Sequence, residues 1–142
     1  MIPLNVRLFD SRVFTPLRDG VPVTMKVPLD IGVPKEAVGV MVNLTATRPS
    51  ADRDARPNAS WRGHLKAWAH GDPPKDGSVL NFNPLAGDRG FDYDADGNPE
   101  GGFPIFNTVF VELAPDNTFS LMSVGSDTEI IVDIQAYSTP AV

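Results

Sequence analysis

The sequence predicts an all-β fold: an antiparallel β-sandwich, jelly-roll or immunoglobulin-like, with about eight strands and two long loops. Two observations support this prediction. Short runs in which apolar and polar residues alternate recur along the chain, and no stretch shows sustained helical periodicity. The 14 prolines and 12 glycines fall mostly between these runs, where turns are expected. A chain of 142 residues suits one domain, so residues 1–142 are predicted to form a single sandwich.

The longest strand pattern covers residues 38–47 (VGVMVNLTAT). One face of this strand is apolar and mostly β-branched, and it is predicted to lie at the centre of the sandwich. That face comprises Val38, Val40, Val42, Leu44 and Ala46. Asn43 points the other way, and Asn81, Asn107 and Asp133 are likewise set singly into apolar runs. A polar group in a buried run needs a partner, so we expect Asn43 to be buried and hydrogen-bonded. All four residues are expected to fix how the strands join.

The remaining strands are assigned in chain order from shorter runs of the same kind. They are residues 6–9, 21–27, 64–70, 78–82, 107–113, 119–124 and 129–137. Pro22 predicts an edge position for its strand, because proline cannot donate a hydrogen bond to a ladder. The turn residues 114–117 (APDN) predict a hairpin between the strands on either side. Helix is limited to one turn near residues 35–38, and the long loops are residues 48–62 and 84–104.

Composition and charge argue against several classes of function. A formal net charge of −6 disfavours general binding to nucleic acid or to an anionic membrane surface. The chain has no cysteine, which excludes disulfides and thiolate chemistry. No apolar run approaches the ~20 residues of a membrane span. The first residues, MIPLNVRLFDSR, lack the basic start and apolar core of a signal peptide, so no such peptide is expected.

Eight short motifs follow one another along nearly the whole chain. They are VRLFDSR (6–12), GVP (32–34), AVGVMVNLTAT (37–47), GHLKAWAHG (63–71), SVLNF (78–82), FNTVFVEL (106–113), FSLMSVGS (119–126) and IIVDIQAY (130–137). In this order they resemble a β-sandwich repeat domain of actinobacterial exported proteins, which occurs beside cell-wall hydrolases and in virion proteins of phages that infect those bacteria. The family more often has Thr at Ser11 and Gly at Ala136, and its connections are shorter than the two long loops here.

The resemblance implies a non-catalytic accessory module. A member that begins with its own Met and lacks a signal peptide looks more like a virion protein than a hydrolase fragment. We therefore expect a structural or interaction protein of a bacteriophage virion, either a capsid decoration protein or a minor tail component. Its partners would be other virion subunits and itself, as a homo-oligomer for which we expect a trimer. The alternative is an extracellular or cell-surface module that binds actinobacterial cell-wall glycan.

The acidic segment DYDADGNPEGG contains a candidate calcium site. Asp92, Asp94 and Asp96 alternate, as the ligands do in the first half of a calcium loop. The second half does not match, because Phe103 occupies the place of the bidentate glutamate, although Glu100 lies near enough to serve as a later or water-mediated ligand. Two interpretations stay open: a calcium site with these four carboxylates, or a solvated acidic loop.

The strand at residues 64–70 (HLKAWAH) predicts a surface for interaction. Its outward face is expected to carry His64, Lys66, Trp68 and His70. An exposed tryptophan among polar side chains suits sugar stacking or a subunit contact. The third interpretation is that a loop containing Trp61 covers Trp68. The two histidines lie about 20 Å apart along a strand, too far to share one metal ion.

Arg7, Asp10 and Arg12 are predicted to form a structural ion pair that pins the first strand, because arginine binds a carboxylate through two hydrogen bonds. Catalytic constellations are not expected. The chain has no GxSxG elbow, no cysteine nucleophile, and no second carboxylate at a fixed distance from Asp10. We therefore do not expect an enzyme.

Overall fold

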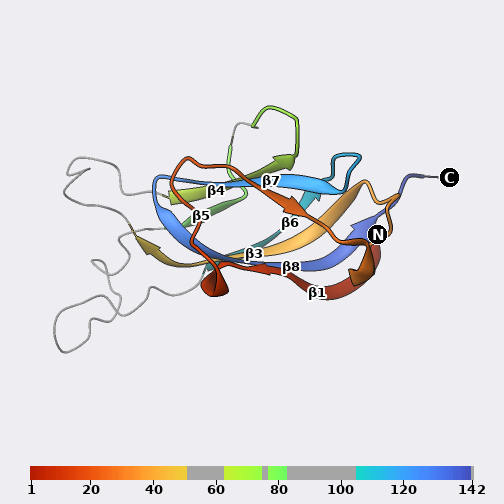
Figure 1. Ribbon diagram of the computed structural model, residues 1–142, viewed down its shortest axis with the longest axis horizontal. Helices are drawn as coiled ribbons and strands as arrows, with labels where there is room; N and C mark the ends of the chain where they lie inside the picture. Colours follow the sequence, from red (N-terminus) through yellow and green to blue (C-terminus); the bar gives the residue numbers. More distant parts are fainter. Residues whose placement is uncertain (51–62, 75–76, 83–104, 142) are drawn as a thin grey trace.

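A computed structural model describes residues 1–50, 63–74, 77–82 and 105–141. These residues form an antiparallel β-sandwich in which two four-stranded sheets face each other (Figure 1), as the sequence predicted. Helix within them is limited to two short 3-10 turns. The elements are β1 (Ile2–Asp10), η1 (Ser11–Val13), β2 (Val23–Lys26), η2 (Leu29–Ile31), β3 (Gly39–Ser50), β4 (Gly63–Ala69), β5 (Leu80–Phe82), β6 (Ile105–Glu112), β7 (Thr118–Val124) and β8 (Asp127–Ser138).

Strand pairing identifies the sandwich as a jelly roll rather than an immunoglobulin-like fold. We call the sheet with order β1-β8-β3-β6 the long-strand sheet, and the sheet with order β2-β7-β4-β5 the short-strand sheet. β1 pairs with β8, β2 with β7, β3 with β6 and β4 with β5, all antiparallel. The second half of the chain therefore folds back along the first, and the resulting ribbon wraps around the core. Only the connection from β4 to β5 stays within one sheet.

The hairpin expected around residues 114–117 is wrong. The turn itself is tight: Asn117 has φ 61° and donates its N–H to the Ala114 carbonyl over 2.9 Å. However, β6 belongs to the long-strand sheet and β7 to the short-strand sheet, so the turn connects the two layers. Turn residues determine where a chain reverses, whereas the pairing of each strand depends on the apolar face that it buries. The local pattern could not separate these two outcomes.

The core lies between the sheets, and β3 contributes its centre. Val40, Val42 and Leu44 are fully buried, and Ala46 is nearly so, which confirms the predicted inward face. Val38 is the exception, because 43% of it is exposed. β3 begins one residue later, so Val38 lies at its end, although its backbone still bonds across to neighbouring strands. The other sheet covers this face with Leu65, Phe119 and Leu121, all fully buried.

Three of the four polar residues within the strands, Asn43, Asn107 and Asp133, link neighbouring elements as predicted, whereas the Asn81 side chain bonds locally to Ser78. Asn43 is half-buried rather than buried, and its Oδ1 accepts a hydrogen bond from the Thr108 hydroxyl over 3.3 Å, which joins β3 to β6. Asn107 donates its side-chain amide to the Val79 carbonyl over 2.9 Å. That bond connects β6 to the residue before β5, so it ties the two sheets together at one side of the sandwich.

One ion pair holds β1 against β8, and another stabilises the corner that follows β1. Arg7 Nε on β1 donates to Asp133 Oδ1 on β8 over 2.9 Å, and the two residues are 126 positions apart in the sequence. Asp10 accepts two side-chain hydrogen bonds from Arg12, at 2.9 and 2.7 Å, and also caps η1 by accepting the Arg12 backbone N–H. These bonds confirm the predicted structural role and hold the pKa of Asp10 at about 2. Buried Ser11 completes the corner, because its hydroxyl oxygen accepts a backbone N–H from β8.

Candidate functional site

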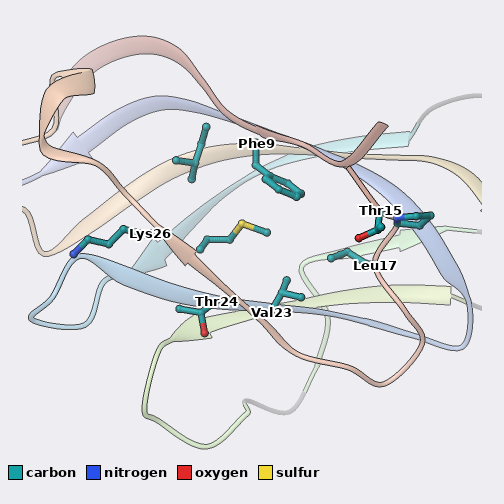
Figure 2. Close-up of a pocket in the computed structure, with 9 residues that line it drawn as sticks. Phe9, Thr15, Leu17, Val23, Thr24 and Lys26 are labelled. Carbon is teal, nitrogen blue, oxygen red and sulfur yellow. The ribbon is translucent and has the colours of Figure 1, made fainter. Parts of the chain in front are cut away.

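An apolar pocket of about 310 Å3 opens between β1 and β2, each of which is an edge strand of its own sheet. Figure 2 shows Phe9 on one side and Val23 on the other, with Leu17 and Thr15 at one end. The described residues that line it are Leu8, Phe9, Thr15, Pro16, Leu17, Val23, Thr24, Met25 and Lys26. Neither β1 nor β2 has a partner strand on its outer side within the described chain, so this side of the sandwich is open.

Exposed apolar side chains lie on the segments that follow β1 and precede β2, the two strands beside this pocket. Phe14 stacks on Phe9 with ring centroids 5.8 Å apart and the planes nearly parallel, yet it remains 73% exposed. Val13 is equally exposed, and Val21 is half exposed. We call Val13, Phe14 and Val21 the apolar rim. Phe14 directly follows η1 and donates its N–H to the Ser11 carbonyl, so the capped corner at Asp10 also positions this ring.

Sequence reasoning missed the apolar rim. Val13 and Phe14 lie in VFTPL, a segment that shows no strand alternation, whereas Val21 lies at the start of the predicted strand 21–27, ahead of the first residue of β2. The available signal was composition, because valine and phenylalanine are unusual in a connection that has no partner. A second exposed aromatic pair lies on the outer face of β6, where Phe106 is 68% exposed and Phe110 is 45% exposed.

The outward face predicted for β4 is found on the short-strand sheet. Leu65 and Ala69 are buried toward the core, which confirms the inward half of the pattern. Trp68 points the other way but is only 4% exposed. Sugar stacking and a subunit contact through an exposed Trp68 are therefore both contradicted, and its burial agrees with the alternative that another segment covers it. Trp61 lies outside the described residues.

His70 is held at the end of β4 by hydroxyl groups of neighbouring strands. Its Nδ1 lies 3.0 Å from Ser120 Oγ on β7 and 3.3 Å from Thr24 Oγ1 on β2. Ser120 is 5% exposed, so its hydroxyl has little access to a substrate. The contact links three strands across the outer face of the short-strand sheet, and we assign it a structural role.

A polar pocket of about 250 Å3 lies on the same face, between β4 and β5. Its described lining residues are His64, Lys66, Gly77, Ser78 and Asn81. His64 and Asn81 are cross-strand partners, which places their side chains next to each other. Burial lowers the pKa of His64, and the positive charge of Lys66 lowers it further. Two of the predicted surface residues, His64 and Lys66, thus come together in one pocket.

The predicted calcium ligands Asp92, Asp94, Asp96 and Glu100 lie outside the described residues. Within the described ranges, no group of three His, Asp or Glu side chains is arranged to hold a metal ion. No helix in this part of the chain has the length and apolar character needed to cross a bilayer.

Comparison with known proteins adds no relative. No protein-family model matches the chain, and no curated protein matches it either. The resemblance to the actinobacterial domain therefore stays a prediction from its eight motifs. The two pockets and the apolar rim are the surface features that bear on function.

Proposed function

We propose that this protein is a non-catalytic structural protein of a bacteriophage virion, acting as a capsid decoration protein or a minor tail component. It binds copies of itself and other virion subunits through the apolar pocket and the apolar rim. The observation that carries the proposal is the rim, because Phe14 is fixed by stacking yet 73% exposed beside an apolar pocket. Exposed apolar side chains next to an apolar recess are typical of an interaction site.

The position of Phe14 favours tight association. A ring that is already stacked on Phe9 loses little conformational freedom when a partner covers it. Aromatic side chains at the centre of an interface also contribute most of its affinity. The pocket behind the ring supplies a recess of about 310 Å3, which a protruding apolar side chain of the partner fills.

The recess of one copy receives a protruding group of the next, and a head-to-tail arrangement of this kind is the heterologous contact that a trimer needs. Heterologous contacts generate closed rings when the rotation closes, which supports the expected trimer. The jelly-roll topology agrees with the proposal by analogy alone, since this architecture recurs in viral capsid and lectin domains.

Light scattering after size exclusion tests the proposal. The wild-type protein is expected to run as a trimer. Phe14→Ser is expected to run as a folded monomer that still melts cooperatively, because the lost side chain packs on the surface rather than in the core. Phe106→Ser is the matched control, since Phe106 is almost as exposed but lies on β6. A monomeric wild-type protein, or an oligomer that survives Phe14→Ser, contradicts the proposal.

The virion assignment has a separate test. Mass spectrometry of purified particles of the source phage is expected to find the protein at a constant copy number. Capsid and tail genes are expected on either side of its own gene. Absence from purified particles would exclude the virion role even if the trimer were confirmed.

Cell-surface glycan binding is the second candidate function. Burial of Trp68 removes the expected sugar-stacking platform. The polar pocket favours this function, because the side chains of its described lining all carry groups that hydrogen-bond to sugars. Purified actinobacterial cell wall should sediment the protein if this function is correct.

Calcium binding through Asp92, Asp94, Asp96 and Glu100 remains a further part of the proposal, and a melting temperature unchanged by calcium and by EDTA would remove it.

A further inference from the structure

The polar pocket between β4 and β5 is rich in hydrogen-bond donors. The Ser78 hydroxyl donates to Asn81 Oδ1 over 2.8 Å, so the amide oxygen is engaged and the two Nδ2 hydrogens serve other partners. Lys66 brings an ammonium group with three N–H donors, so it can contact a ligand and keep the interaction that it already makes. His64 adds a ring N–H from the position opposite Asn81.

The described lining of this pocket differs in charge from the protein as a whole. The chain has 18 acidic and 12 basic residues, yet none of the described lining residues is acidic. The pKa of His64 is lowered by burial and by Lys66, so its ring is neutral at pH 7. Lys66 is then the charged group of the described lining, and its three N–H donors can bond an anionic ligand beside the interaction that it already makes.

We propose that this pocket binds a small oxyanion, the carboxylate or phosphate group of a larger molecule, through Lys66, Asn81 and His64. Its volume of about 250 Å3 lies below the ~300–1,000 Å3 of pockets that enclose drug-sized ligands, so it holds one anionic group. Acidic sugars and phosphodiester polymers both present such a group. The site is independent of the proposed self-association, because β4 and β5 lie at the opposite side of the short-strand sheet from β2.

Chemical-shift titration of the full chain tests the proposal with three probes at pH 7: sodium glucuronate, inorganic phosphate and glucose. Glucuronate and phosphate are expected to shift the Asn81 side-chain amide and the His64 ring signals, and glucose is not. The tighter of the two anions identifies the source, an acidic sugar or a phosphate. Lys66→Met is expected to weaken the binding of both anions about tenfold, the effect of losing one hydrogen bond from a charged donor.

Two variants control for folding and for general charge. Asn81→Asp places a negative charge at an exposed position in the pocket, so it should abolish anion binding without lowering the melting temperature. Lys35→Met removes an exposed lysine outside the pocket and should leave the affinity unchanged. Equal binding of glucose and glucuronate overturns the proposal. So does the absence of shifts with any probe at high millimolar concentration, or undiminished binding by Asn81→Asp.

Discussion

The long-strand sheet and the short-strand sheet bury the same kinds of side chain but differ in length and in what they expose. β3 and β8, at the centre of the first, have 12 residues each, whereas no strand of the second exceeds seven. Both pockets border the short-strand sheet, one beside β2 and the other on β4 and β5. The long ladders therefore hold the jelly roll together, while the ends and edges of the short strands border the two recesses.

The largest expected effect separates the two sheets directly. Val42→Asp should unfold the domain, at a cost of about 4 kcal/mol or more, because it buries a charge without a partner at the centre of the long-strand sheet. Val23→Asp, on edge strand β2 beside the open pocket, should only lower the melting temperature, because water reaches that site. Circular dichroism during thermal melting measures both. A cooperative unfolding transition in Val42→Asp would contradict the expected difference between the two sheets.

Two glycines provide a matched pair, one in each sheet. A Cβ on Gly39 would lie 2.0 Å from the Phe110 ring, and a Cβ on Gly63 would lie 2.3 Å from the Phe82 ring. Phe110 is 45% exposed and can swing into solvent, whereas Phe82 is 6% exposed and cannot. We therefore expect Gly63→Ala to cost about 3 kcal/mol and Gly39→Ala about 1 kcal/mol, by overpacking.

Urea unfolding of both glycine variants gives these free energies. The expected order reflects the freedom of each ring rather than the sheet in which it lies. A larger loss in Gly39→Ala would show that the exposed ring on β6 is held more firmly than its accessibility indicates.

The buried hydroxyl of Ser11 tests the corner that joins β1 to β8. Ser11→Ala removes the acceptor of the Ile130 N–H and should cost about 2 kcal/mol, because a buried donor is left without a partner. Ser11→Thr keeps the hydroxyl and should cost much less. The exposed hydroxyl of Ser78, two residues before β5, is the matched control, and Ser78→Ala should leave stability nearly unchanged. Equal losses in the two alanine variants would contradict the comparison.

The smallest expected effect is a dependence on pH at the same corner. Hydrogen bonds from Arg12 lower the pKa of Asp10 from 3.8 to about 2 in the folded protein. A lowered pKa means that Asp10 adds stability above about pH 4, and that this part is lost as the pH falls from about 4 to about 2. Melting temperatures measured across this interval should therefore fall more in the wild type than in Asp10→Asn. Arg12→Gln should remove the same acid-sensitive contribution to stability. Parallel curves of melting temperature against pH for all three proteins would exclude that contribution.

Strand positions and faces were predictable because alternation is a local property. The predicted strands all appear, with ends shifted by a few residues, and the inward faces of β3 and β4 are correct except at Val38. The ion-pair corner at Asp10 was also predictable, since Arg12 lies only two residues away. Of the candidate surface, the pairing of His64 with Lys66 in one pocket follows from their shared outward face.

Strand partners, burial by distant segments and the two pockets depend on tertiary structure. Arg7 meets Asp133 across 126 residues, and no local pattern specifies such a partner. Trp68 was assigned correctly to the outer face, but alternation does not say whether that face is covered. Alternation in the sequence specifies which way the side chains of a strand point, because the strand backbone sets that direction residue by residue. Only the wrapping of the jelly roll decided what each side chain meets, because those neighbours come from the far end of the chain.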